Sequence, residues 1–286
     1  MPPLSLAKGM SLIPASASKP FATLLLQNEP VNACTFDFYQ TLKALLVDHL
    51  PRTNPPTRGL VIASDVKKPI FTAGNDLREF FTPLTTPSRF RDYWQAFQGG
   101  ISALYSTPIL TIAAVRGFSG AAGTGIMLAC DYRVGTKDAV VGLNEAALGV
   151  PVPPIWAAMM ADTCHKGKNR AEHLCKYAIM LEGEEAFAEG LLDEMCPSND
   201  KDQLREQAEK RMMELLSKVP DEGRTITKMY MRQRLSKAWE EELKSSEMAD
   251  NYYGYFNSEV SRTLVAKILK HTPDGKSLQR EEKGKL

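Results

Sequence analysis

The sequence predicts an α/β fold with parallel strands, and two observations support it. Short, mainly apolar runs at residues 59–64 and 109–115 are typical of strands that are buried on both faces of a parallel sheet. These runs alternate with longer segments whose apolar residues recur at helical spacing, as in parallel sheets with crossover helices. Beyond about residue 200 only the helical pattern continues. We therefore expect an α/β core followed by a helical C-terminal region.

The expected elements of the core begin with a strand at 21–26 and a helix at 35–50, where Phe36, Tyr39 and Leu42 share one face. A buried strand at 59–64 comes next, and a helix at 88–105 carries a stripe of aromatic residues. The other expected core elements are a strand at 109–115, a buried helix at 121–130 and short strands at 132–134 and 139–143.

Helical periodicity dominates the rest of the chain. Pro220 is expected to separate two helices, and Ser258 is a typical N-cap residue. The expected helices are 169–180, 184–190, 201–219, 224–253 and 259–270. This organisation divides the chain into residues 1–20, an α/β core at 21–200 and a helical region at 201–286. The first of these parts contains four serines, four prolines and no acidic residue, so it is interpreted as a disordered tail or a targeting peptide.

The composition excludes several classes of protein. The chain has 286 residues, of which 43% are hydrophobic and 24% are charged, as in ordinary globular proteins. Its net charge of +1 argues against a nucleic-acid backbone as the main partner. Five cysteines without a C-x-x-C spacing indicate reduced thiols rather than a disulfide framework. Because no run of 18 apolar residues occurs, no membrane span is expected.

Two catalytic motifs nearly match the glycine-rich stretch at 117–125 and fail. A dinucleotide fingerprint would need a glycine where Leu128 stands. A nucleophile elbow around Ser119 would need a glycine where Ala121 stands, which leaves a serine hydrolase as a remote alternative. The four histidines lack the spacing of metal ligands, so no metal site is expected.

Three segments together carry chemical information: residues 70–77, 117–125 and 141–151. The first two are strand-to-helix turns made of small residues, which leave backbone N–H groups open to a ligand. Two such N–H groups from different turns would form an oxyanion hole. The third segment places Glu145 among apolar residues, where burial would raise its pKa and let it act as a base and then an acid.

Motifs in these segments resemble those of the enoyl-CoA hydratase/isomerase superfamily, the crotonases, over about residues 20–270. The turn Phe71-Thr72-Ala73-Gly74-Asn75-Asp76-Leu77 resembles the family's F-S-A-G-x-D-L motif. Residues 115–117 with 130–133 resemble the frame of the second turn, and residues 185–193 resemble the downstream E-A-x-x-x-G-L-V-D element. The resemblance implies a spiral of ββα units with a C-terminal helical region for trimerisation and for a lid.

The acidic residues distinguish between members of this family. The resemblance implies that a hydratase carries two glutamates, which here correspond to Gly125 and Glu145. A single carboxylate cannot hold water as a pair does, but it can move a proton between two carbons. The chain is therefore similar to the mitochondrial-type Δ3,Δ2-enoyl-CoA isomerases, which convert 3-enoyl-CoA to trans-2-enoyl-CoA in the β-oxidation of unsaturated fatty acids.

The resemblance also implies roles for individual residues. Glu145 would be the catalytic acid and base, and the N–H groups of Asn75 and Ala122 would form the oxyanion hole. Contacts to the CoA thioester would come from the oxyanion residues and from Ala73, Gly74, Asp76 and Leu77. An acyl-CoA is the expected substrate and a homotrimer the expected assembly, with no metal or redox cofactor.

Several alternatives stay open from the sequence. One is an enoyl-CoA hydratase or another acyl-CoA enzyme of the crotonase family, and another is a non-catalytic acyl-CoA-binding protein. Glu79, close to the first turn, is a candidate second acid. The resemblance implies the mitochondrial matrix, whereas the C-terminal Gly284-Lys285-Leu286 resembles the peroxisomal Ser-Lys-Leu signal with glycine in place of serine.

Overall fold

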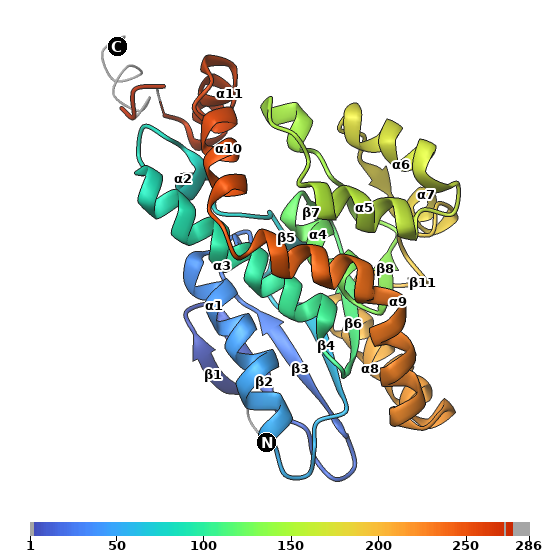
Figure 1. Cartoon of the computed structure of the whole chain (residues 1–286). Helices are drawn as coiled ribbons and strands as arrows, with labels where there is room; N and C mark the ends of the chain where they lie inside the picture. Colours follow the sequence, from blue (N-terminus) through green and yellow to red (C-terminus); the bar gives the residue numbers. More distant parts are fainter. Residues whose placement is uncertain (1–2, 272, 277–286) are drawn as a thin grey trace.

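The computed structural model describes residues 3–271 and 273–276, which form two β-sheets surrounded by helices (Figure 1). The large sheet has the order β1-β2-β3-β4-β6-β8-β11, and the small sheet has the order β10-β9-β7-β5. The strands of the large sheet are β1 Leu4–Ala7, β2 Met10–Ile13, β3 Phe21–Leu26, β4 Gly59–Ser64, β6 Leu110–Val115, β8 Tyr132–Thr136 and β11 Glu194–Cys196. Those of the small sheet are β5 Ile70–Thr72, β7 Phe118–Gly120, β9 Val140–Gly142 and β10 Leu181–Glu182.

The centre of the large sheet is parallel and buried on both faces. Strands β3, β4, β6, β8 and β11 pair in parallel, and every residue of β3, β4 and β6 is buried. Leu60 and Ile62 face one core and Val61 faces the other, because side chains alternate along a strand. This arrangement explains the mainly apolar runs and confirms the predicted α/β fold.

The small sheet aligns the three segments that the sequence singles out. β5 pairs in parallel with β7 through Ile70 opposite Phe118, and β7 pairs in parallel with β9 through Gly120 opposite Gly142. Parallel neighbours end at the same edge of a sheet, so the segments that follow these strands emerge side by side. The sequence does not predict β5 and β7, because three residues are too few to show a period.

Helices pack on both faces of the large sheet. On one face α1 and α3 contribute to the core, and on the other face the core contains Leu204, Ala208 and Met212 of α8. The helices of the core are α1 Phe36–Ala44, α2 Leu77–Phe80, α3 Pro87–Ser106, α4 Ala122–Ala129, α5 Pro154–Thr163, α6 Gly167–Lys176 and α7 Gly183–Ala188. A π turn at Leu45–His49 and 3₁₀ turns at Leu50–Arg52 and Glu145–Leu148 complete it.

The C-terminal region is helical, as predicted, but its helices are divided differently. Its helices are α8 Lys201–Lys218, α9 Asp221–Glu242, α10 Glu247–Phe256 and α11 Glu259–Leu269. The single helix expected at 224–253 is wrong, because the chain breaks after α9 so that Tyr252 and Phe256 of α10 can turn inward and become buried. The helix expected at 169–180 ends at Lys176, since Ala178 has a positive φ of 51° before β10. Ser258 caps α11 as predicted, accepting a hydrogen bond from the Ser261 N–H. No helix in the described part of the chain is long and apolar enough to cross a membrane.

The expectation of a disordered N-terminal tail is wrong for residues 4–13. β1 and β2 form an antiparallel hairpin, and β2 pairs antiparallel with β3. Met10 and Leu12 are 3% and 1% exposed. Strands of four residues show too little periodicity to be recognised, and their burial comes from partners elsewhere in the chain. The alternative interpretation of residues 1–20 as a targeting peptide stays a prediction.

We expect Leu12→Ala to destabilise the protein by about 2–5 kcal/mol, because a buried side chain is lost and a cavity is left. The control is Leu4→Ala in the adjacent strand, where the side chain is 48% exposed and the expected cost is within about 0.5 kcal/mol. Urea unfolding of both variants measures the difference. Equal stabilities would contradict the packing of β2 in the core.

Candidate active site

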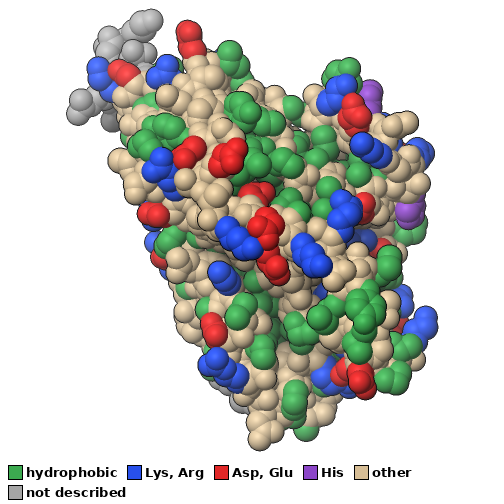
Figure 2. Space-filling view, viewed as in Figure 1, with side chains coloured by type: hydrophobic (Ala, Val, Ile, Leu, Met, Phe, Trp, Pro, Cys, Tyr) green, Lys and Arg blue, Asp and Glu red, His purple; other side chains and the backbone are tan. Residues whose placement is uncertain are grey.

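A cavity of about 380 Å³ lies where the segments after β5, β7 and β9 come together. Its wall is mainly apolar, with a small number of polar groups, as is typical of small-molecule sites. The polar lining residues are Asn75, Asp76, Asn144, Glu145 and Tyr252, and the aromatic ones are Phe80, Trp94, Phe97, Phe118, Trp156 and Phe256. The hollow between the α10–α11 lobe and the α5–α6 lobe shows the apolar side chains of this region (Figure 2).

The turn after β5 leaves one backbone donor free. Cys34 bridges the turn, since its N–H donates to the Gly74 carbonyl at 2.9 Å and its carbonyl accepts from the Asp76 N–H at 3.1 Å. In the described structure the N–H of Asn75, between these two, donates to no protein acceptor. The Asn75 side chain is held by the hydroxyls of Tyr39 and Tyr93, which donate to its Oδ1 at 2.6 and 3.1 Å.

The turn after β7 leaves a second donor free. Ala121 has a φ of 50° and its N–H donates to the Gly142 carbonyl at 3.0 Å, which turns the chain into α4. Ala122 is the first residue of α4, so its N–H has no acceptor within the helix, and no other described residue accepts from it.

Gly74 allows the two turns to touch. It has a φ of 85°, and a Cβ at this position would lie 3.0 Å from the Gly120 carbonyl oxygen and 3.4 Å from the Ala122 nitrogen. Any side chain here would therefore push the turns apart. The two free N–H groups belong to neighbouring turns, as an oxyanion hole requires.

Glu145 begins the 3₁₀ turn that follows β9 and faces the cavity. It is 8% exposed, and neither carboxylate oxygen has a hydrogen-bond partner among the described residues. Burial disfavours the charged form and raises the pKa of the carboxyl to about 8. A carboxyl with this pKa can both take and return a proton near neutral pH.

Trp156 of α5 packs against Gly125, the position predicted to correspond to the second glutamate of a hydratase. A Cβ on Gly125 would lie 3.2 Å from three atoms of the Trp156 indole ring, so the position has no room for a glutamate. Glu79, the candidate second acid, forms an ion pair with Arg89 at 2.6 Å and does not line the cavity. Asp76 lines the cavity but is paired with Arg78 at 2.6 Å and caps α2. Glu145 is thus the unpaired carboxylate of this cavity in the described structure.

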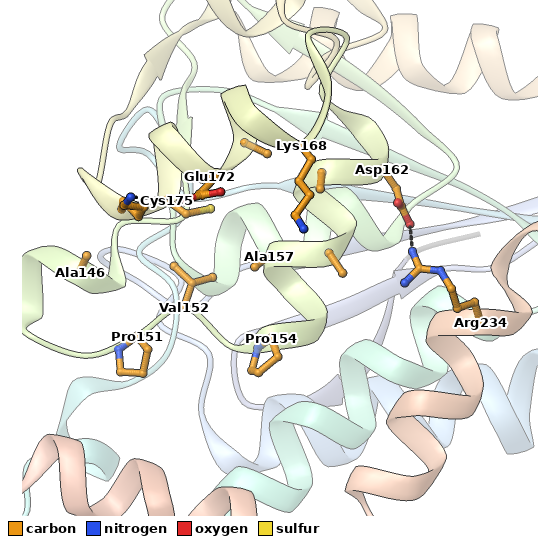
Figure 3. A pocket seen from close by; sticks show the side chains of 14 residues that line it. Ala146, Pro151, Val152, Pro154, Ala157, Asp162, Lys168, Glu172, Cys175 and Arg234 are labelled. Carbon is orange, nitrogen blue, oxygen red and sulfur yellow. Dashed lines mark hydrogen bonds and ion pairs between the residues drawn. The ribbon is translucent and has the colours of Figure 1, made fainter.

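A larger and more open hollow of about 780 Å³ lies on the other side of the Glu145–Leu148 turn, between α5, α6 and α9 (Figure 3). Alanines and prolines make up much of its lining, which also includes Arg234 and Asp162, an ion pair at 2.7 Å. Neither Glu145 nor the two free N–H groups line it, so we place the chemistry in the smaller cavity.

Residues 20–269 match the sequence profile of the enoyl-CoA hydratase/isomerase family. The chain belongs to this family. It is 30% identical to the mouse protein named enoyl-CoA delta isomerase 1, mitochondrial, over 254 residues, which are 87% of this chain and 81% of that protein. It is also 30% identical to the probable enoyl-CoA hydratase EchA17 of Mycobacterium tuberculosis over 183 residues, 63% of this chain and 66% of that protein.

The same fold occurs in a solved structure of this family. The crystal structure of human mitochondrial delta3-delta2-enoyl-CoA isomerase superimposes with a TM-score of 0.82 at 23% identity, covering 97% of this chain and all of that one. The predicted crotonase-type fold with C-terminal helices is therefore confirmed. The relatives include proteins named as isomerases and as hydratases. Family membership therefore indicates an enoyl-CoA enzyme, but it does not distinguish between the two reactions.

Most of the residues predicted for an enoyl-CoA hydratase/isomerase site meet at the cavity. Its wall includes Ala73, Asn75, Asp76, Leu77 and Glu145. Gly74 and Ala122 do not line it and instead form the contact between the two turns. Their roles toward a substrate stay predictions. The Ser119 hydroxyl is buried and contacts no histidine or other described partner, so the hydrolase alternative has no base.

The sequence does not predict which residues of the C-terminal region line the cavity. Tyr252 and Phe256 of α10 and Ile268 and Leu269 of α11 line the cavity. The aromatic residues at 252, 253, 255 and 256 could have indicated a buried helix face, because a helix exposed to solvent does not need four aromatic residues. Their target could not be read locally, since α10 reaches the cavity only after the break that follows α9.

Proposed function

We propose that this enoyl-CoA hydratase/isomerase family member is a Δ3,Δ2-enoyl-CoA isomerase that converts 3-enoyl-CoA to trans-2-enoyl-CoA in the β-oxidation of unsaturated fatty acids. The observation that carries the proposal is that Glu145 is, among the described residues, the one unpaired carboxylate that lines the cavity, while Trp156 packs against Gly125, where a second acid would stand. The similarity to the mouse and rat proteins named enoyl-CoA delta isomerase 1 supports it.

In the first step Glu145 removes a proton from C2 of the substrate. That proton is acidified because it lies between the thioester carbonyl and the alkene. The electron pair of the C–H bond enters the conjugated system and gives a dienolate with negative charge on the thioester oxygen. In this proposal the free N–H groups of Asn75 and Ala122 donate to this oxygen. Each such donor contributes about 10²–10³ in rate.

In the second step Glu145, now protonated, returns the proton to C4. The C2–C3 double bond forms, the thioester carbonyl is restored and the carboxylate is regenerated. One carboxyl group serves both carbons because they are two bonds apart on one face of a planar dienolate. The aromatic wall excludes water, which keeps the proton on Glu145 and strengthens the hydrogen bonds to the oxygen.

The test is an assay of two reactions on the same preparation. Conversion of 3-enoyl-CoA is followed by the ultraviolet absorbance of the conjugated thioester, and hydration of trans-2-enoyl-CoA by loss of that absorbance. We expect isomerisation to exceed hydration by about 10²-fold or more. The reason is that the cavity offers no second carboxylate to hold and activate a water molecule. Hydration at a comparable rate would favour a hydratase, and tight CoA-ester binding without turnover would indicate a binding protein.

The rate should rise with pH up to about 8. Glu145 must be ionised to accept the C2 proton, and burial raises its pKa to about 8. Below that value kcat/KM should increase about tenfold per pH unit, and above it the profile should level off. Initial rates between pH 5.5 and 9.5 measure this. A midpoint of the kcat/KM profile near pH 4.5 would show that Glu145 is solvated in the working enzyme.

We also propose a homotrimer in the mitochondrial matrix. Four apolar side chains on α9 are exposed in the single chain, which supports burial against another copy: Ile226, Met229, Tyr230 and Met231. Sedimentation analysis of the full chain tests the assembly. The mouse, rat and human relatives carry the word mitochondrial in their names, and fluorescence microscopy of the chain tagged internally would test the location. Gly284-Lys285-Leu286 lies outside the described residues.

A further inference from the structure

Two tyrosines buried behind the first turn have no role in the mechanism above. Tyr39 of α1 and Tyr93 of α3 are both 0% exposed, and neither lines the cavity. The Tyr39 hydroxyl lies 2.6 Å from Oδ1 of Asn75, and the Tyr93 hydroxyl lies 3.1 Å from the same atom. Both hydroxyls thus meet at the side chain of the residue whose backbone N–H is a free donor of the site.

The distances fix the orientation of the Asn75 side chain. A separation of 2.6 Å suits an O–H···O hydrogen bond and lies below the usual range of an N–H···O bond, so the amide oxygen is the atom that faces Tyr39. Burial raises the pKa of the Tyr39 and Tyr93 phenols well above the usual value, so both hydroxyls keep the protons that they donate. Asn75 is therefore anchored, through its side-chain oxygen, to groups outside the cavity.

The peptide that carries the free donor is fixed at both of its ends. The Cys34 N–H donates to the Gly74 carbonyl at 2.9 Å. In a trans peptide the C=O and N–H groups point in opposite directions, so this bond turns the Asn75 N–H away from Cys34. Tyr93 holds Cys34 in turn, because its hydroxyl donates to the Cys34 carbonyl at 2.5 Å and accepts from the Asp76 N–H at 3.3 Å. At the other end of the peptide, the anchored side chain fixes the Cα of Asn75.

We infer that Tyr39 and Tyr93 are positioning residues of the oxyanion hole: through the Asn75 side chain, their hydroxyls hold the Asn75 N–H in the direction from which it donates to the thioester oxygen. A donor held in this way needs no reorientation when charge develops on that oxygen. The inference deepens the proposed function and rests on the part of it that assigns the oxyanion donors.

Phenylalanine variants test the hydroxyls and keep the packing of the rings. Tyr39→Phe and Tyr93→Phe each remove one oxygen and preserve edge-on contacts such as that of Tyr93 with Phe80, at a centroid distance of 5.2 Å. We expect kcat to fall about threefold to tenfold in each variant and about 10²-fold in the double variant, which is the loss expected for one oxyanion donor. KM should change less than about threefold, because the lost interaction is made mainly in the transition state.

The matched control is Tyr105→Phe. Tyr105 is also a buried tyrosine of α3, but it does not line the cavity and packs against Trp239, at a centroid distance of 5.4 Å. Its substitution should leave kcat unchanged. A loss in Tyr105→Phe equal to that in Tyr93→Phe would overturn the inference, because any change in the packing of α3 would then have the same effect.

A double-mutant cycle shows whether the hydroxyls act through Asn75. Asn75→Ala keeps the backbone N–H and leaves both tyrosines in the core, so its kcat should fall about as far as that of the double tyrosine variant. In the Asn75→Ala background, Tyr39→Phe should lower kcat no further, because the anchor is already absent. Losses that multiply as if the two sites were independent would overturn the inference.

Infrared spectroscopy provides a measurement that needs no turnover. A saturated acyl-CoA labelled with carbon-13 at the thioester carbonyl identifies the band of the bound carbonyl in difference spectra. We expect the parent protein to lower the frequency of this band and the double tyrosine variant to lose about half of that shift, because one of two donors is misplaced. An unchanged shift in the variant, or no shift in the parent, would overturn the inference. If the parent shows the shift but does not isomerise 3-enoyl-CoA, the proposed function fails while the spectra still decide the role of the tyrosines.

Discussion

Glu145→Gln should lower the isomerase rate by about 10³-fold or more, the largest effect that a single substitution in this protein is expected to have. Glutamine has the shape of glutamate but cannot accept the C2 proton or return it to C4. The oxyanion donors are backbone groups and stay in place, so binding of a CoA ester should be retained. Steady-state kinetics with 3-enoyl-CoA and calorimetric titration with a saturated acyl-CoA measure the two quantities.

The control for this variant is Glu79→Gln. Glu79 follows the first turn but is paired with Arg89 outside the cavity, so its loss should change the rate less than twofold. If Glu145→Gln kept a tenth of the parent activity, another group would be the base. If Glu79→Gln were inactive, the ion pair would hold the first turn.

We expect Glu145→Gln to lose activity without unfolding, and the unfolding free energy of this variant should show this. Glu145 has a pKa of about 8 in the folded state against 4.5 in the reference state, so folding favours its protonated form. The stability linked to that proton is present in full below pH 4.5 and is lost as pH rises through 8. Above pH 8 the variant, which has no charge to bury, should exceed the parent by a few kcal/mol in unfolding free energy. Urea unfolding at pH 5 and pH 9 measures the change.

Gly125→Glu should destabilise the protein by about 4 kcal/mol or more and should not create a hydratase. The added side chain meets the indole of Trp156 at its first carbon, and its carboxylate would be buried without a partner. For a chain of this size such a loss lowers the melting temperature by roughly 10 °C. Calorimetry measures the change, and the hydration assay shows whether any water addition appears.

Two other glycine variants serve as comparisons for the stability of Gly125→Glu. Gly125→Ala adds only the carbon that would lie 3.2 Å from Trp156 and should give an intermediate loss. A Cβ on Gly223 in α9 would meet nothing within 4 Å, so Gly223→Ala should leave stability unchanged or raise it by up to about 1 kcal/mol. Hydratase activity in a stable Gly125→Glu protein would show that Trp156 moves aside, and the distinction between isomerase and hydratase drawn from this contact would fail.

Much of the fold could be predicted, and the exceptions share one physical cause. The buried strands at 21–26, 59–64 and 109–115 are recognisable because every residue of a doubly covered strand is buried, so that nearly all of them are apolar. Residues 4–13 and the three-residue strands β5 and β7 escape prediction, because they are too short to show a period. They are stable only through their pairing with strands that are distant in the chain. The break after α9 is likewise set by where the aromatic residues of α10 can be buried.

The sequence by itself determined the chemical groups of the site: two small-residue turns, one acidic residue at 145 and no acid at 125. Local composition is enough for this, because each group is encoded within a few residues. Only the tertiary structure decided that the turns touch at Gly74, that Glu145 lacks a partner and that Trp156 fills the space beside Gly125. Only it placed Tyr252 of α10 on the wall of the cavity that Glu145 also lines. The proton affinity of Glu145 depends on how much water surrounds it, and that is set by side chains from α5, α6 and α10 that no local pattern places there.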